Sequence, residues 1–578
     1  MKANINLELV RYSIRNILFQ PRFDSIIWLF SAMASANWNT SRKTERFRAA
    51  LDPNTQSRSF LVDFSDTLSP ESPVSALLRL HYTARRRDGT ANAASAAEKR
   101  NQMQRLDAII GSMLNPSQPK TSQVLNPRQL VLPRIARERL DRIQARAARI
   151  GVIGLGYVGL PLSLLLAEAG FKVTGFDIDA KKVDDLEAGR SYIFRIAAAE
   201  IEAARQKGFT ATTDFARLSG QDAIILCVPT PLTAHHEPDL SFVESTAKAA
   251  APWIREGQLV VLESTTYPGT TEELLIPLLE AGSPHGLKAQ AKGAAAESGV
   301  FYAAFSPERE DPGNVTVARR DIPKVVGGHE AIATELAATL YEAIFARAVR
   351  VSSTRVAEMT KLLENIYRCV NIALVNELKL LSLRMGVDIW EVIDAAATKP
   401  FGFQPFYPGP GLGGHCIPID PFYLSWKARE FDFNTRFIEL AGEVNEAMPA
   451  HVAQSVAQAL NRHGKAMNGA RILMLGMAYK KDIDDLRESP SLTVIELLRE
   501  QGAEVLYNDP YFPAVGRGRH YNLNMRSTPL TDLAQYDCVL IMTDHSEYDY
   551  AAIVRQSRLV VDTRNATKGI ASEKIVRC

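Results

Sequence analysis

The residue with the clearest chemical potential is a cysteine surrounded by glycines. Cys416 lies in the segment 408–420, which reads Pro-Gly-Pro-Gly-Leu-Gly-Gly-His-Cys-Ile-Pro-Ile-Asp. Glycines leave room for a substrate carbon to approach the sulfur, and a thiolate is a strong nucleophile. We therefore expect Cys416 to be catalytic, with Asp420 four residues away. For Cys227, Cys369 and Cys538 we expect the usual role of a lone cysteine, a small buried apolar residue.

Two polar residues share one face of a predicted long helix. Residues from about Thr354 to Met385 contain few helix breakers, and Lys361 and Asn365 stand four positions apart in Lys-Leu-Leu-Glu-Asn. Side chains at i and i+4 are neighbours on a helix surface. The pattern alone leaves open whether this pair belongs to a site or to an ordinary solvated face.

Three polar loops after predicted strands could complete a site. They contain Glu308 in Ser-Pro-Glu-Arg-Glu, Thr266 in Glu-Ser-Thr-Thr, and Lys480 and Arg487 in Tyr-Lys-Lys-Asp-Ile-Asp-Asp-Leu-Arg-Glu. Basic residues in such a loop suit a diphosphate. Taken singly, each segment could also be plain loop sequence.

We expect no metal site. The run His235-His-Glu237 could suggest one, but no third ligand is suitably spaced, and the surrounding residues resemble a polar loop. The five cysteines include no Cys-X-X-Cys pair, which argues against a zinc site or a disulfide framework.

A glycine loop predicts a dinucleotide site. Gly154-Leu-Gly156-Tyr-Val-Gly159 lies between an apolar strand and an apolar helix, and Asp177 ends the next strand. Glycines let the backbone approach a pyrophosphate at the N-terminus of the helix, and the carboxylate can accept the ribose hydroxyls. Because that carboxylate would repel a 2′-phosphate, NAD is favoured over NADP. FAD, or a structural turn without nucleotide, are the alternatives.

These residues are positioned by an α/β fold that repeats. Strands are expected at 150–153, 172–176, 223–228 and 259–262, and again at 472–475, 504–507, 538–542 and 559–561. We predict two Rossmann-like doubly wound domains joined by a long central helix and helical dimerisation region. The expected boundaries are an Arg-rich N-terminal extension over 1–147, a dinucleotide domain over 148–350, the central region over 351–462 and a C-terminal domain over 463–578.

Charge divides the 578 residues into two parts. The total of 67 basic and 65 acidic side chains is nearly neutral, but residues 1–149 carry 24 basic against 12 acidic ones and the remainder carries a net charge of −10. We therefore expect no nucleic-acid partner for residues 150–578, and no apolar run is long enough to predict a membrane span. We expect the extension to be poorly ordered, or to be sequence translated ahead of the true start. Residues 26–36 match a signal peptide only weakly.

Together the segments resemble the UDP-glucose/GDP-mannose dehydrogenase family over roughly 148–578. The motifs that carry the resemblance are GLGYVGLPL, VPTPL, ESTTYPGT, SPERE, KLLENIYR, GGHCIPID and AYKKDIDDLRES. The resemblance implies an NAD-binding domain, a central dimerisation region, a UDP-binding domain and a homodimer or higher oligomer. It also implies two oxidations of a sugar C6 alcohol to a carboxylate, through a thiohemiacetal and a thioester on Cys416.

The resemblance implies roles for the matching residues. Lys361 is expected beside the developing oxyanion, and Asn365 is expected to orient the sugar or a water. Asp420 and Thr266 match positions that handle protons and the water, and Glu308 matches a glutamate of thioester hydrolysis. The cofactor residues expected are Gly154, Gly156, Tyr157, Val158, Gly159, Asp177, Lys182, Thr230, Thr266 and Arg487. The substrate residues expected are Glu308, Lys361, Asn365, Gly413, Lys480 and Arg564.

The substrate expected is a UDP-N-acetylhexosamine. Residues 398–411 look most like the branch of the family that acts on these sugars, with UDP-N-acetylglucosamine first, in a cytoplasmic pathway to a surface polysaccharide. A second glutamate of the UDP-glucose enzymes is replaced here by Pro312. UDP-glucose, UDP-N-acetylmannosamine and UDP-N-acetylgalactosamine remain alternatives, as does a non-catalytic protein that binds nucleotide sugars.

Overall fold

The computed structural model describes residues 130–578, except for 194, 234–236, 285, 295, 311–316, 415–416 and 519–520. Cys416 therefore lies outside the described residues, as do His235, Pro312 and the first 129 residues. Within the described part, no helix is long and apolar enough to cross a membrane.

The first α/β domain is built on a nine-stranded sheet. The strand order is β3-β2-β1-β4-β5-β7-β8-β9, with β6 beside β7, and every pair is parallel except the antiparallel β7–β8. Because β1 lies inside the sheet, the chain departs from it in both directions, as in a doubly wound fold. The strands are β1 (Arg149–Ile153), β2 (Lys172–Phe176), β3 (Phe209–Thr212), β4 (Ala223–Leu226), β5 (Leu259–Leu262), β6 (Lys288–Ala289), β7 (Val300–Phe305), β8 (Lys324–Gly328) and β9 (Ala348–Val351).

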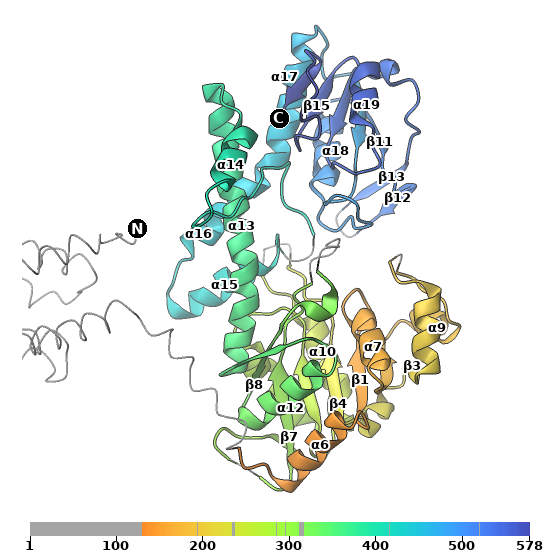
Figure 1. Ribbon diagram of the computed structural model, residues 1–578, viewed down its shortest axis with the longest axis vertical. Helices are drawn as coiled ribbons and strands as arrows, with labels where there is room; N and C mark the ends of the chain where they lie inside the picture. Colours follow the sequence, from red (N-terminus) through yellow and green to blue (C-terminus); the bar gives the residue numbers. More distant parts are fainter. Residues whose placement is uncertain are drawn as a thin grey trace, which may run out of the picture. The chain divides into compact units, whose positions relative to one another are not determined.

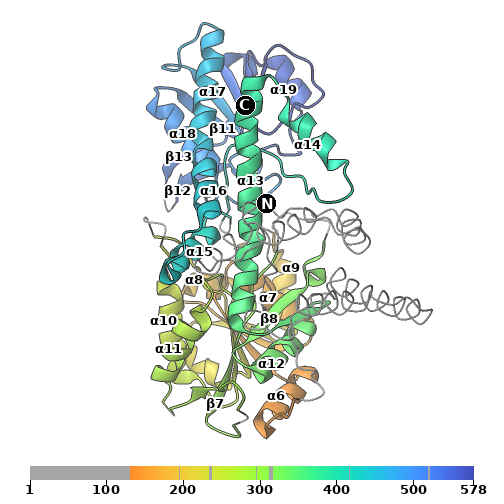
Figure 2. The ribbon, with the colours of Figure 1, turned by 90° about the vertical axis from the view of Figure 1, so that its left-hand side faces the viewer.

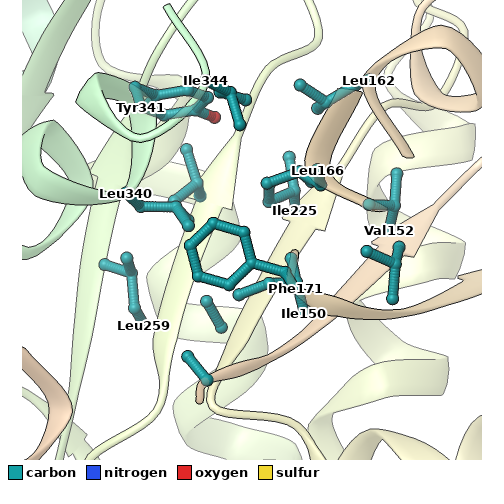
Figure 3. Packing of buried hydrophobic residues seen from close by; sticks show 14 of the residues in the cluster. Ile150, Val152, Leu162, Leu166, Phe171, Ile225, Leu259, Leu340, Tyr341 and Ile344 are labelled. Carbon is teal, nitrogen blue, oxygen red and sulfur yellow. The ribbon is translucent and has the colours of Figure 1, made fainter. Parts of the chain in front are cut away.

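Helices cover both faces of this sheet. One buried apolar cluster joins the sheet to α7 (Gly159–Glu168), α8 (Ala180–Glu187), α9 (Ala198–Gln206) and α12 (Ala331–Glu342). Figure 3 shows its centre, where Phe171 lies among side chains from the strands, α7 and α12. A second cluster joins the opposite face to α10 (Ser241–Ala250) and α11 (Ile276–Gly282). Continuous apolar strands such as β4 and β5 fit burial on both faces.

One helix of the first domain lies before the domain boundary that was expected after residue 147. Helix α6 (Arg134–Gln144) packs against α12, and its residues Ala136 and Ile143 are buried in the core of the first domain. Arg139 and Arg142 both pair with Asp222, whose carboxylate also accepts the backbone N–H of Arg149. Residues 134–144 are thus folded onto the domain, because an apolar stripe and two arginines on one helix bind it there.

The central region is helical, and its main helix has the predicted bounds. Helix α13 (Thr354–Met385) begins at Ser353, whose hydroxyl accepts the Val356 N–H, and ends at Gly386, which has φ 68°. It packs against α15 (Asp420–Ala428) and α16 (Arg436–Glu446), and it leads from the first domain towards the second (Figures 1 and 2). Helices α14 (Ile389–Ala397) and α17 (Met448–Arg462) complete the region.

The C-terminal domain repeats the α/β pattern with a five-stranded parallel sheet. The strand order is β11-β10-β14-β15-β16, and a separate antiparallel pair is formed by β12 and β13. The predicted two-domain α/β fold is thereby confirmed. The elements are β10 (Arg471–Leu475), α18 (Pro490–Glu500), β11 (Glu504–Asn508), β12 (Ala514–Arg517), β13 (Asn522–Arg526), β14 (Cys538–Ile541), α19 (Tyr550–Gln556), β15 (Val560–Asp562) and β16 (Ile575–Arg577).

Candidate active site

The glycine loop lies between β1 and α7, where the sequence predicted it. Gly154 has φ +91°, and a Cβ there would come within 2.5 Å of the Cys227 carbonyl oxygen. A Cβ on Gly159 would collide with the Gly154 carbonyl oxygen, whereas a Cβ on Gly156 would meet no heavy atom within 4 Å. Two glycines therefore permit the turn, and the third leaves open space beside the backbone. No side chain caps α7 at Val158, so its first N–H groups can bind phosphate.

Asp177 holds this loop and follows β2. Its carboxylate accepts the N–H of Leu155 at 2.9 Å and that of Asp179 at 3.0 Å, and it pairs with Lys182 at 3.3 Å. The side chain is 7% exposed. One carboxylate therefore fixes the glycine loop and follows β2, as the ribose-binding acid of a doubly wound domain does, so the residues present fit a dinucleotide.

Two threonines follow neighbouring strands. Thr230 comes after β4, and its carbonyl oxygen accepts the Tyr423 hydroxyl of α15 at 2.6 Å. Thr266 comes after β5 and is fully buried, and its Oγ1 has no hydrogen-bond partner among the described residues. A buried hydroxyl rarely stays unpaired, so Thr266 is suited to bond a ligand or water.

Lys361, Asn365 and Asp420 form a buried polar cluster. Lys361 and Asn365 lie on α13 and are 6% and 3% exposed, and Asp420 begins α15 and is 3% exposed. Asn365 donates its side-chain N–H to Asp420 Oδ2 at 2.5 Å. Burial raises the pKa of Asp420 to about 7, against the opposing effects of Lys361 and of the Asn365 hydrogen bond. A carboxyl with such a pKa can exchange protons near neutral pH.

Glu308 follows β7, and both of its carboxylate oxygens accept hydrogen bonds. Oε1 accepts the N–H groups of Arg309 and Glu310 at 2.8 Å each, and Oε2 pairs with Lys324 at 3.1 Å. Burial would raise the pKa of Glu308, but Lys324 and the two backbone N–H groups outweigh it and lower the pKa to about 2. With its pKa lowered this far, the Glu308 carboxyl is ionised at neutral pH.

The loop after β10 contacts both the glycine loop and the cysteine segment. The Arg487 guanidinium lies 4.9 Å from the centre of the Tyr157 ring, and its carbonyl oxygen accepts the Gly414 N–H at 2.8 Å. A Cβ on Gly413 would collide with the Tyr479 side chain. The glycines beside Cys416 therefore allow close packing against this loop, which also carries the partly buried Lys480.

Arg564 lies against the segment that leads to Cys416. Its Nε donates to the Met542 carbonyl at 3.0 Å and its Nη2 donates to the Tyr479 carbonyl at 3.4 Å. A Cβ on Gly409 would come within 2.6 Å of its Nη1. Burial lowers the pKa of the Arg564 guanidinium, since Asp544 and Asp562 only partly compensate for lost solvation.

Sequence reasoning missed the residue that binds Glu308. Lys324 begins β8 and is 2% exposed, and a lysine at the start of the apolar strand Lys-Val-Val-Gly-Gly was the signal available. A second missed pair, Arg309 with Glu364 at 2.5 Å, ties the Glu308 loop to α13 one residue before Asn365.

The run 235–237, where the sequence favoured a polar loop over a metal site, gives no structural outcome, because His235 and His236 are outside the described residues. Among the described residues, no group of three or more His, Cys, Asp or Glu side chains is arranged to hold a metal ion.

A doubly wound domain with a dinucleotide loop, beside a buried lysine–amide–carboxyl cluster, defines a dinucleotide-dependent oxidoreductase. Three family models match the chain in order. They are the NAD binding domain of the UDP-glucose/GDP-mannose dehydrogenase family at residues 148–345, its central domain at 355–447 and its UDP binding domain at 473–569. The chain belongs to this family, and it is an NAD-dependent nucleotide-sugar dehydrogenase.

The similar curated proteins are named for different N-acetylated sugars. UDP-N-acetyl-D-glucosamine 6-dehydrogenase of Pseudomonas aeruginosa is 35% identical over 69% of this chain and 91% of its own. UDP-N-acetyl-D-mannosamine dehydrogenase of Pyrococcus horikoshii is 36% identical over 73% of this chain and 96% of its own. The solved structure of the Pyrococcus horikoshii UDP-D-ManNAc dehydrogenase has a TM-score of 0.65 at 33% identity, covering 74% of this chain and 98% of its own.

Proposed function

We propose that this enzyme oxidises the C6 alcohol of a UDP-N-acetylhexosamine, with UDP-N-acetylglucosamine first, to the uronic acid. The observation that carries the reaction class is the buried cluster of Lys361, Asn365 and Asp420 from two separate helices. The sugar class rests on relatives named for N-acetylglucosamine, N-acetylmannosamine and N-acetylgalactosaminuronic acid, of which the last, from Ralstonia nicotianae, is 37% identical over 422 residues.

The chemistry proposed requires a nucleophile, because an alcohol dehydrogenase without one would stop at the aldehyde. NAD bound at the glycine loop accepts the hydrides. Cys416 adds through its thiolate to the aldehyde carbon, and the thiohemiacetal that forms can be oxidised to a thioester. Lys361 and Asn365 stabilise the oxygen that becomes negative, and a fixed donor of this kind is worth about 3–4 kcal/mol in the transition state.

Two carboxyl groups then divide the proton transfers. Asp420, with its pKa raised to about 7, can take a proton from the reacting hydroxyl or from Cys416. Glu308, with its pKa lowered to about 2, stays charged and can receive a proton from the water that attacks the thioester. Thr266 offers its hydroxyl, which has no hydrogen-bond partner among the described residues, to the ligand or water. Lys480 and Arg564 are the proposed diphosphate and substrate contacts of the C-terminal domain.

The test is a comparison of NADH formation with four UDP-sugars, those of N-acetylglucosamine, N-acetylmannosamine, N-acetylgalactosamine and glucose. The proposal expects two NADH per sugar and the highest kcat/KM with an N-acetylated sugar. A clear preference for UDP-glucose would contradict the sugar class. A single NADH per sugar would contradict the thioester route.

A non-catalytic role as a nucleotide-sugar-binding protein is the alternative from another class. Such a protein would bind UDP-sugar and NAD but form no NADH with any of the four substrates. Cys416, Lys361 and Asp420 are all retained in the sequence, which favours the enzyme.

We also propose that the enzyme is a homodimer or a higher oligomer. Helix α13 exposes large apolar side chains along its length, with Leu363 60%, Leu374 52% and Leu381 51% exposed. Such a stripe on a helix is usually covered by a partner. Light scattering coupled to size exclusion would show at least twice the 63.8 kDa chain mass. A monomer at micromolar concentration would contradict this.

With the same reaction we propose that the enzyme acts in the cytoplasm, in the synthesis of a surface polysaccharide.

A further inference from the structure

A buried lysine faces two carboxylates, one of which is the candidate site residue Glu308. Lys324 Nζ lies 3.0 Å from Glu263 Oε1 and 3.1 Å from Glu308 Oε2. Lys324 and Glu263 are each 2% exposed. Tyr341 donates its hydroxyl to the same Glu263 oxygen at 2.6 Å. These four residues lie just after β5, just after β7, at the start of β8 and in the last turn of α12.

Strand register explains why the lysine meets Glu308. Strands β7 and β8 are antiparallel, with Phe305 opposite Gly327. Continuing that register by three residues places Glu308 opposite Lys324, although Glu308 has already left the strand. Glu263 directly follows β5, which pairs with β7 in parallel through Leu262 and Phe305. The sheet therefore brings both acids to one lysine.

The ammonium group of Lys324 is buried and lies near two aromatic rings. It lies 5.3 Å from the centre of the Tyr341 ring and 5.4 Å from that of Phe345. Burial of a charge in such surroundings is costly unless its partners are ionised. Burial raises the pKa of Glu263, while the pKa of Glu308 is lowered. The positive charge of Lys324 is therefore balanced mainly by the ionised carboxylate of Glu308.

We propose that Lys324 is a positioning residue for the hydrolysis half of the reaction, and that it holds Glu308 ionised and fixed toward the attacking water. The inference rests on the proposed function. In the step concerned, the water oxygen bonds to the thioester carbon, the carbon–sulfur bond breaks, and sulfur leaves as the Cys416 thiolate. The proton released by the water passes to a Glu308 oxygen.

The orientation is set by three bonds to one carboxylate. The backbone N–H groups of Arg309 and Glu310 occupy Oε1, and Lys324 occupies Oε2. Oε2 keeps a further lone pair, so it can still accept a proton from water. The groups that face Glu308 are Lys324 of β8, Glu263 after β5 and the two backbone N–H groups. The Cys227 sulfur lies 3.7 Å from Glu263 Oε2.

Lys324→Met tests the proposal in the full-length enzyme. It should give two NADH per site in a first burst and then turn over about 100-fold more slowly, the order of loss expected for a disabled general base. Intact-mass measurement should show the acyl group retained on the protein. The KM for the UDP-sugar should change little, because Lys324 is buried and is not one of the proposed substrate contacts. Lys324→Arg, which keeps the cation, should recover part of the rate.

The pH profile separates positioning from a structural role. Without the ammonium group, burial raises the pKa of Glu308, so the acidic limb of the hydrolysis rate should move to higher pH in Lys324→Met. In Lys324→Arg the acidic limb of the hydrolysis rate should stay at low pH, as in the wild type. Glu263→Gln removes the buried ion pair of Lys324 with Glu263 but leaves Lys324 beside Glu308. The hydrolysis rate of this variant should fall less than that of Lys324→Met. Lys288→Met is the matched control, since Lys288 is 65% exposed and pairs with Glu280 on the surface.

A double-mutant cycle decides whether Lys324 acts through Glu308. In a Glu308→Gln background, Lys324→Met should cost little further rate. Equal losses in both backgrounds, or a slow Lys324→Met enzyme without acyl adduct, would overturn the proposal. If Lys324→Met does not fold, Lys324→Gln takes its place, because it fills similar space without charge. A wild-type enzyme that forms no NADH would instead refute the proposed function.

Discussion

Asn365 of α13 donates a hydrogen bond to Asp420, the first residue of α15, across 55 residues of sequence. The two helices are packed against each other, so the bond fixes the carboxyl beside Lys361. An amide that donates to one carboxylate oxygen leaves the other oxygen available to the reacting group. The site therefore depends on the contact between α13 and α15.

The raised pKa of Asp420 predicts an acidic limb in the rate profile. If the carboxylate is the base, the ionised fraction falls about tenfold for each pH unit below its pKa of about 7. We expect kcat/KM, which reports the free enzyme, to rise with pH up to about 7 and then level. Asp420→Asn should lose about 10²-fold or more in rate and lack this limb. An unchanged limb in the variant would assign it to another group.

Cys416→Ala should prevent carboxylate formation. Without the thiol no thioester can form, so the steady-state rate of NADH formation should fall by about 10³-fold or more. NAD affinity should not change, because the glycine loop and Asp177 are intact. Stopped-flow NADH absorbance and fluorescence titration with NAD measure the two quantities. Cys369→Ala is the control, since Cys369 is a buried cysteine of α13, and a normal NADH yield from Cys416→Ala would refute the mechanism.

Local patterns in the sequence predicted much of this fold. The scarcity of helix breakers between Thr354 and Met385 predicted α13, whose caps in the structure are Ser353 and Gly386, and the glycine loop with Asp177 predicted the first βαβ unit. These features depend on neighbours in sequence. Each short apolar strand could likewise be assigned where turn residues bounded it.

Long-range contacts could not be predicted in this way. The approach of Lys324 to Glu308 requires an antiparallel pairing of β7 and β8 within a mostly parallel sheet, which no local pattern reveals. The ion pair of Arg139 with Asp222 joins residues 83 positions apart, so the stretch that contains α6 resembled part of a basic tail. In both cases the missing information was which distant charge would neutralise a buried one.

Asp177→Asn should weaken selection between NAD and NADP. The amide oxygen can still accept the Leu155 N–H, so the glycine loop should remain in place, but the negative charge that repels a 2′-phosphate is lost. Weakening one charged hydrogen bond to ribose costs about 1.5–3 kcal/mol, which is about ten- to a hundredfold in KM for NAD. The KM for NADP should fall. Asp179→Asn is the control, because Asp179 is an exposed helix cap, and equal effects of the two variants would contradict the assignment.

Helix α6 should contribute to the stability of the first domain through Asp222. This side chain is 8% exposed and pairs with Arg139 and Arg142, so replacing both arginines by alanine leaves a mostly buried carboxylate with only the Arg149 N–H. We expect the free energy of unfolding to fall by about 1–3 kcal/mol, and Tm to fall by several degrees. Arg134→Ala is the matched control on the same helix, since the Arg134 side chain is 86% exposed and its only ion pair among the described residues is with Glu138. If both variants melt like the wild type, α6 does not stabilise the domain; if only the double variant melts early, residues 134–144 belong to the folded enzyme.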